Sequence, residues 1–230
     1  MQTLDDWLED DIQTTSPTLY QKDFIYKTKK ITFSMHYKHK LITVDYLHKF
    51  IVSDEKKIWM CSHDKPCSNF NNCWACPPIA PSFEKYNKKG YTNCLVYAFW
   101  VDWDFEINSD NQYFKLVNAN RTLSPYTWKY GQLLEHKLGG KDMIDGRCPL
   151  CTPCKASLTP REPCTFPKQR RSSLEALGID DCTLSEEVLH HKIYWYKKEG
   201  KKTISPPYLT CIHGLLTNSE QPEEMLCLSL

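Results

Sequence analysis

The chain has 230 residues, of which 41% are hydrophobic and 25% are charged, so it can bury a core without disulfide bonds. Its formal net charge of +1 argues against a surface built throughout for nucleic acid or anionic membranes. The first residues are acidic, and no apolar run approaches the roughly 20 residues that span a bilayer. We therefore expect a cytoplasmic protein without a membrane partner, and we do not expect nucleic acid as its partner.

The N-terminal part of the chain predicts an arm followed by a hairpin. Residues 1–20 are acidic and rich in serine and threonine, with few apolar side chains, which is typical of an arm. Polar and apolar residues alternate over residues 24–37, as in strands buried on one face, and residues 27–30 would form the turn. Residues 41–52 then change to helical spacing.

The middle of the chain predicts a buried strand and a long helical segment. Valine and aromatic residues dominate residues 91–103, which indicates a central strand. Ser109 and Gln112 fit a capping box, so a helix should begin there. Pro125 ends or bends it, and helical spacing continues to a stop at Gly139. We expect one kinked helix or a helical hairpin.

The last third of the chain completes the predicted fold. Ser172 and Glu175 form a second capping box, and Gly178 closes the brief helix that follows. Further strands are predicted at residues 143–144, 193–196 and 208–216. Residues 218–230 form a polar tail. Together these elements predict the α+β class, with one domain over residues 21–217 in which helices pack on a mixed sheet and two long cysteine-rich loops bind metal.

Twelve of the residues are cysteines, and they are clustered. Without an export signal the thiols should stay reduced, and grouped reduced cysteines bind metal more often than they form disulfides. A periplasmic or extracellular setting would reverse this preference. We therefore interpret the two main cysteine groups as metal sites.

The second cysteine group is the more specific one. Its candidate ligands are Cys148, Cys151, Cys154 and Cys164. Three closely spaced thiolates with a fourth farther along suit the corners of a [4Fe–4S] cluster. Zinc uses the same sulfur atoms but usually takes two separated pairs of cysteines, so we favour the iron–sulfur cluster and keep zinc as the alternative. Lysine and arginine residues around this loop would offset the negative charge of the cluster.

The first cysteine group lies in the proline-rich segment 60–82, which predicts an irregular loop. Its candidate metal ligands are Cys61, Cys67, Cys73 and Cys76. His63 is an additional nitrogen donor. A second [4Fe–4S] cluster, a zinc ion, or a cluster with one iron open to an external ligand would each fit this looser spacing.

The two groups together resemble a prokaryotic family of predicted metal-binding proteins of unknown function (domain of unknown function 2284). The resemblance is carried by Cys61, Cys67 and residues 74–78, 147–151, 162–164 and 171–180. It implies a cytosolic metal or iron–sulfur protein whose reaction is not established. Cys73 departs from the family pattern, so the first site has either an open fourth position or one that Cys73 closes.

Two functions follow from these observations. The first is an iron–sulfur protein, active in electron transfer or as a redox enzyme, whose partner is a redox protein or a small molecule such as a corrinoid. The second is a zinc-stabilised module that contacts protein or nucleic acid without catalysis. Weaker candidates for acid–base or metal chemistry are the pairs Glu135-His136, His190-His191 and Cys211-x-His213. The chain has no phosphate-binding glycine loop, so we do not expect nucleotide-dependent chemistry.

Overall fold

The structure is a computed structural model that describes residues 19–27, 32–63, 67–102, 112–195, 197–199, 202–204 and 206–220. Nearly all of the expected N-terminal arm and C-terminal tail lie outside these residues, as do most of the expected hairpin turn and Ser109 of the first capping box. Those expectations stay predictions.

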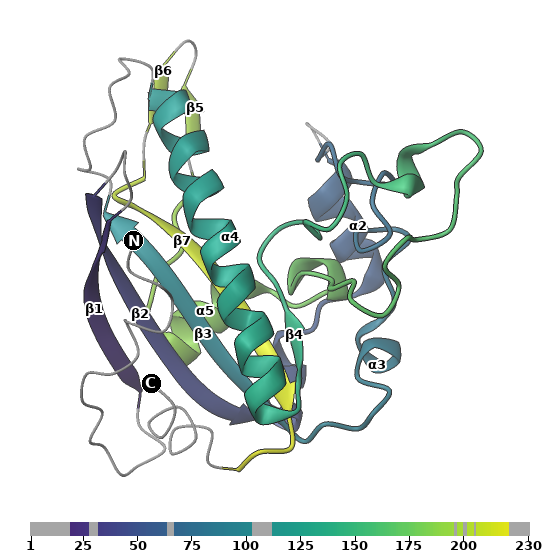
Figure 1. Ribbon diagram of the computed structural model, residues 1–230, viewed down its shortest axis with the longest axis horizontal. Helices are drawn as coiled ribbons and strands as arrows, with labels where there is room; N and C mark the ends of the chain where they lie inside the picture. Colours follow the sequence, from purple (N-terminus) through teal and green to yellow (C-terminus); the bar gives the residue numbers. More distant parts are fainter. Residues whose placement is uncertain are drawn as a thin grey trace.

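Five strands form one sheet in the spatial order β1, β2, β3, β7, β4 (Figure 1). Their bounds are β1 Tyr20–Lys27, β2 Thr32–Thr43, β3 Asn93–Asp102, β7 Tyr208–Thr217 and β4 Lys141–Met143. All four strand pairs are antiparallel. In the described residues the one parallel pairing is an isolated bridge between Ile144 and Ser173. The α+β class is thus confirmed. The sheet itself is antiparallel, whereas a mixed sheet was expected.

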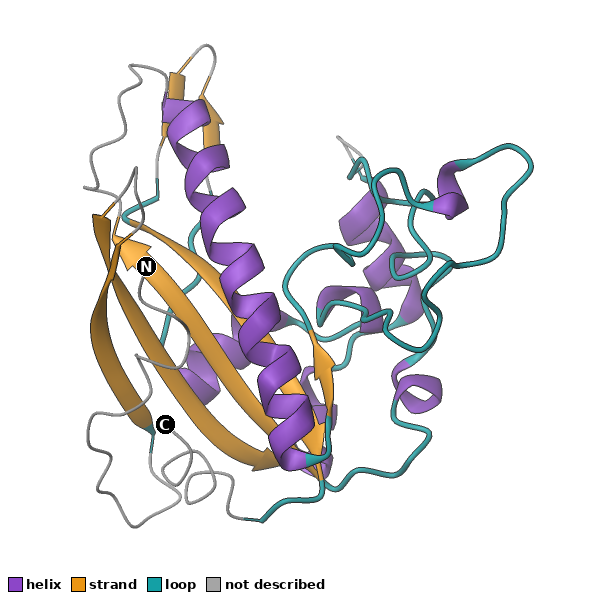
Figure 2. Ribbon diagram, viewed as in Figure 1, coloured by secondary structure: helices purple, strands orange, loops and turns teal. Residues whose placement is uncertain are grey.

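The central position of β3 explains its unbroken apolar composition. Tyr97 on one face belongs to the core beneath helix α4 (Gln112–Leu138), and Val96 on the other belongs to the core beneath helix α5 (Asp181–Leu189). Both side chains are fully buried. Figure 2 shows α4 running across one face of the sheet. A strand covered on both faces has no solvent side, so polar residues do not alternate along it.

Helix α4 is a single helix that runs through Pro125. Of the two expectations, one helix or a helical hairpin, the structure selects the first. Proline lacks the N–H that would bond to the carbonyl one turn earlier, but the helix continues because its apolar side packs on the sheet, with Leu123 and Leu134 fully buried. Among the described helices none is both long and apolar enough to cross a membrane.

Three helices were not predicted, and each begins at a residue whose side chain caps it. Ser53 accepts a hydrogen bond from the backbone of α2 (Asp54–Ser62), and Ser82 does the same for α3 (Phe83–Tyr86). Asp180 caps α5 by accepting from Thr183 N. Serine and aspartate are preferred at this position because they satisfy a backbone N–H that the helix leaves unpaired.

Several predicted boundaries differ from the structure. Strand β2 extends to Thr43, so the helix expected from residue 41 begins later, as α1 (Val44–Leu47) and a 3-10 turn, η2 (His48–Phe50). The predicted strand over residues 193–196 is absent from its described part, residues 193–195. The nearby strands β5 (Lys197–Glu199) and β6 (Lys202–Ile204) form a separate two-stranded sheet.

The second capping box also shifts by one residue. Ser173 rather than Ser172 accepts the backbone N–H of Ala176, at the start of the 3-10 turn η4 (Glu175–Leu177). Gly178 ends that turn with φ of 87°, as expected of a glycine at a helix C-terminus.

The two cysteine loops form a lobe beside the β4 edge of the sheet, together with α2, α3, η4 and the 3-10 turn η3 (Lys155–Ser157) (Figure 1). The second loop leaves the sheet after Ile144 and returns at Ser172, whose carbonyl accepts the N–H of Ile144 at 3.1 Å. Leu174 N in turn donates to the Ile144 carbonyl at 3.3 Å. Both ends of this loop are therefore fixed at one point beside β4.

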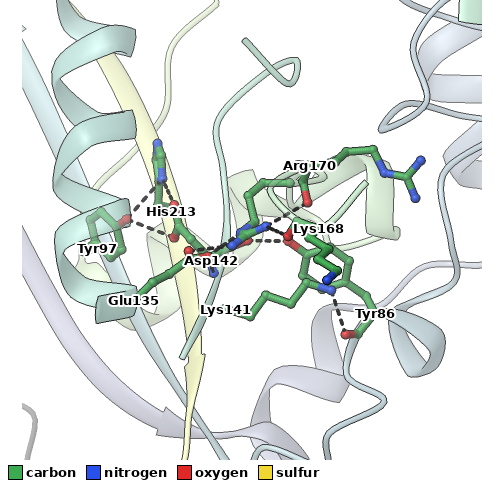
Figure 3. Close-up of polar contacts among 9 residues, drawn as sticks. Tyr86, Tyr97, Glu135, Lys141, Asp142, Lys168, Arg170 and His213 are labelled. Carbon is green, nitrogen blue, oxygen red and sulfur yellow. Dashed lines mark hydrogen bonds and ion pairs between the residues drawn. The ribbon is translucent and has the colours of Figure 1, made fainter. Parts of the chain in front are cut away.

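A polar network joins the end of the second loop to the sheet (Figure 3). Arg171 forms a two-pronged ion pair with Glu135 of α4, with Nη2 2.6 Å from Oε2. The same guanidinium donates to the carbonyls of Lys168 and Arg170, both at 3.0 Å. Glu135 Oε1 also accepts the backbone N–H of Asp142 at 2.6 Å. One carboxylate thus holds both the loop and β4.

Asp142 continues this network into the core. Its carboxylate lies 2.8 Å from His213 Nδ1 and accepts the Tyr97 hydroxyl at 3.0 Å. Its backbone carbonyl accepts the Tyr86 hydroxyl at 2.5 Å. Burial raises the pKa of Asp142, while the charge and hydrogen bond of His213 oppose that rise. Gly131 of α4 makes room for this cluster, because a Cβ there would lie 2.1 Å from Asp142 Oδ2.

We expect Glu135→Gln to lower the free energy of unfolding by about 2 to 4 kcal/mol, because it leaves the Arg171 charge nearly buried without its partner. Urea unfolding of the metal-loaded protein measures this. The matched control is Glu162→Gln, which breaks the solvent-exposed pair of Lys155 and Glu162 and should cost less than about 1 kcal/mol. Equal losses in the two variants would contradict the anchoring role of Glu135.

Candidate metal centre

Five cysteine side chains line one small pocket in the lobe beside β4. They are Cys73 of the first group and Cys148, Cys151, Cys154 and Cys164 of the second. Trp74 and Arg170 line the same pocket. The four predicted ligands of the second group are therefore brought together by the fold, and Cys73, assigned to the first group by sequence, joins them.

The surroundings of the second group differ from one thiol to another. Burial raises the pKa of Cys148, although the backbone N–H groups of Leu150 and Arg171 oppose this. The pKa of Cys151 is also raised, by desolvation and by the neighbouring thiols of Cys154 and Cys164. Backbone N–H groups directed at a sulfur stabilise its thiolate form, which is the form that binds metal.

Cys73 connects the two groups. Its side chain is buried, and the thiols of Cys76 and Cys154 and the backbone N–H groups of Ala75 and Cys148 all lower its pKa. The Cys76 side chain is the strongest of these influences, and together they lower the pKa of Cys73 to about 6. Cys73 thus lies in contact with Cys76 of the first group and Cys154 of the second.

The remaining cysteines of the first group lie near one another. Cys61 lies in the last turn of α2, and its carbonyl accepts the N–H of Cys67 at 3.0 Å. Cys76 is buried, and its contact with Cys73, its burial and the nearby thiols of Cys67 and Cys61 raise its pKa. The ring of His63 is exposed and stacks on Trp59 with centroids 4.6 Å apart.

The two loops also dock on each other outside the thiols. Trp74 Nε1 donates to the carbonyl of Glu162 at 3.0 Å. From the other loop, Arg161 donates to the side-chain oxygen of Asn71 at 2.6 Å and to its carbonyl at 3.2 Å. Segments about 90 residues apart in sequence thus form one unit around the cysteines.

The donor set fits a metal that prefers sulfur ligands. Eleven cysteines lie in the described part of the chain, and all are free thiols. Iron–sulfur clusters and zinc both accept four thiolates. Of the histidine, cysteine and acidic residues described, one trio has its donor atoms all within 4.8 Å of one another, namely Asp180, Asp181 and Cys182. No three described sulfurs of the two loops therefore lie within that limit of one another.

The Asp180 trio has structural roles that account for its position. Asp180 caps α5, Asp181 accepts the backbone N–H of Cys182 at 2.9 Å, and Cys182 accepts from Trp195 at 3.4 Å. These contacts explain the grouping without a cation.

Sequence reasoning missed a set of buried carboxyl groups behind the first cysteine group. Burial raises the pKa of Glu175 well above its usual value, and the nearby Asp181 and Asp145 raise it further. Glu175 in turn acts electrostatically on Cys61. Its Oε2 atom is buried without a hydrogen-bond partner among the described residues. No spacing pattern signals this set, because its members come from three separate segments.

Four of the six weaker candidates have structural partners for their side chains. Glu135 pairs with Arg171, and His213 contacts Asp142. His191 Nε2 lies 2.8 Å from Thr210 Oγ1, and burial lowers its pKa to about 4. Cys211 is buried beside Ser124. These groups stabilise the sheet and its link to the loops, and none of them lines the cysteine pocket.

Comparison with known proteins agrees with the chemistry of the loops. The pattern of one family, described as "Predicted metal-binding protein (DUF2284)", matches residues 48–211. This span includes both cysteine groups and every described helix except α1. The comparisons with curated proteins and with solved structures gave no match. The chain therefore belongs to the DUF2284 family of predicted metal-binding proteins.

Proposed function

We propose that this protein is an iron–sulfur protein in which Cys148, Cys151, Cys154 and Cys164 hold a [4Fe–4S] cluster. When bound, such a cluster accepts and releases one electron at a time. The observation that carries the proposal is the convergence of these four thiols on one pocket, at the end of a loop whose two ends are fixed beside β4.

The spacing of the sulfurs favours the cluster over a single zinc ion. Four thiolates around one zinc, with bonds of about 2.3 Å, stand about 3.8 Å apart. No three cysteine sulfurs in the described residues come within 4.8 Å of one another. A [4Fe–4S] cluster places each thiolate on a different iron and so needs them farther apart.

A second metal site at Cys61, Cys67 and Cys76 would extend this function. Cys73 lies between the two groups and contacts Cys76 and Cys154. It would complete the first site as its fourth ligand and place the two centres next to each other. Adjacent centres suit electron transfer, either to a redox partner protein or to a small molecule, such as a corrinoid, that reacts at the first site.

The first test is the metal itself. Protein purified without oxygen should contain iron and acid-labile sulfide and absorb broadly near about 400 nm, and dithionite should bleach that band. Cys151→Ser and Cys164→Ser should lose the band and most of the iron, whereas Cys182→Ser should keep both. Colourless protein with stoichiometric zinc would instead support a zinc-stabilised interaction module.

The role of Cys73 needs a separate test. We expect Cys73→Ser to retain the absorbance and electron spin resonance signal of the second site and to lose the metal of the first. Metal analysis of this variant beside Cys148→Ser, which should show the reverse pattern, separates the two sites. Loss of both sites in Cys73→Ser, or of neither, would contradict its assignment to the first.

A further inference from the structure

A basic pocket lies next to the cysteine pocket. Its volume is about 540 Å³, within the range of small-molecule sites in proteins. It is formed by the segment from α3 to Tyr91, the start of β4, and the end of the second cysteine loop. Arg170 lines this basic pocket and the cysteine pocket as well.

The charge of the basic pocket is one-sided. Seven of its 13 lining residues are lysine or arginine, and none is acidic. Three lysines, Lys85, Lys88 and Lys89, are exposed at its α3 side. Across from them are Lys141 of β4 and the cations of the second loop. A chain with a formal net charge of +1 has thus concentrated a quarter of its 29 lysines and arginines around one cavity.

Among the described residues, most of these cations have no carboxylate partner. In the part of the chain that the structure describes, Arg171 is the one cation of the seven that pairs with a carboxylate, that of Glu135. Lys141 instead lies over the ring of Tyr86, 3.4 Å from its centroid, and donates to the Tyr86 carbonyl at 3.2 Å (Figure 3). Desolvation and the neighbouring cations, Arg171 first, lower the pKa of Lys141 to about 8.

Mutual repulsion among cations around one cavity is relieved when an anion enters it. A singly charged anion would leave most of this charge uncompensated, and the volume exceeds what one inorganic ion fills. Phosphoryl groups carry up to two charges and several acceptor oxygens, and they suit mixed lysine and arginine donors. The chain lacks a glycine-rich phosphate loop, so side-chain cations would do the binding.

We propose that this pocket binds a small phosphoryl-bearing molecule with two or more negative charges. The assignment goes beyond the proposed redox function and does not depend on the identity of the metal. Because Arg170 borders both pockets, the bound molecule would lie beside the metal centre, as a substrate or an effector of that centre would.

The test is calorimetric titration of the metal-loaded protein with inorganic pyrophosphate. Binding should be weakened at least about tenfold in Lys88→Gln/Lys89→Gln, since two charge-assisted contacts are removed. The matched control, Lys49→Gln/Lys192→Gln, removes two exposed lysines that lie over tyrosine rings elsewhere and should bind as the parent does. No binding, or equal binding by both double variants, would overturn the proposal.

Three further titrations locate and define the site. Pyrophosphate should bind Cys151→Ser at least as tightly as the parent; loss of binding there would mean that the anion binds the metal centre instead. Citrate should bind more weakly, and equal affinity would overturn the phosphoryl class. A short DNA duplex should not compete with pyrophosphate. If the duplex bound more tightly than pyrophosphate, and this binding depended on Lys88 and Lys89, the proposal of a small-molecule ligand would be overturned in favour of nucleic acid.

Discussion

The ion pair of Arg171 and Glu135 fixes the cysteine loops to the folded core, and the position of the thiols depends on it. The second loop contains little regular secondary structure. Its shape therefore depends on how its two ends are fixed and on the metal that its cysteines would hold. Arg171 lies where that loop ends, and its guanidinium also binds the carbonyls of Lys168 and Arg170. Removing two charges from water is costly, and the two-pronged geometry offsets that cost. The same Glu135 carboxylate holds β4.

Because of this anchoring, the sheet orders the two ends of the loop and a bound metal would order its interior. The sheet fixes where the loop starts and returns, through the pairing of Ile144 with Ser172 and Leu174. Closing a loop costs conformational entropy in any case, and here the closure is achieved by backbone hydrogen bonds. A metal then has to order only the interior of the loop, where the thiols lie. Binding free energy that would otherwise order the chain is available for holding the metal.

Sequence patterns predicted the elements whose signal is local. Strand β3 was predicted from its composition, and the hairpin of β1 and β2 from alternating polar and apolar residues, because burial against a core sets the pattern of consecutive residues. The second cysteine group was assigned from spacing alone, and the fold brings its members together. Helix α5 was missed although Asp180 and the buried Leu184 and Val188 mark it. This helical pattern is short and closely follows a cysteine-rich loop, so sequence analysis did not recognise it.

The rest depends on contacts between distant segments. Cys73 belongs to the first group by spacing, but docking of the two loops places its sulfur against Cys154. Asp145 comes beside Glu175 and Asp181 because Ile144 pairs with Ser172 and Leu174. No period or motif relates residues that are 30 or more positions apart, so such sites emerge only when the topology is known. These are also the places where burial changes a pKa most.

The basic pocket and the cysteine pocket meet at Arg170, and this contact makes their charges interdependent. A cluster held by thiolates is negative, and an added electron makes it more so; nearby cations favour that electron. On the two proposals made here, a bound phosphoryl group would neutralise the same cations and disfavour reduction. Binding linkage is reciprocal, so reduction of the cluster would weaken the hold on the anion. Through Arg170, anion binding would therefore alter reduction of the cluster, and reduction would alter the affinity for the anion.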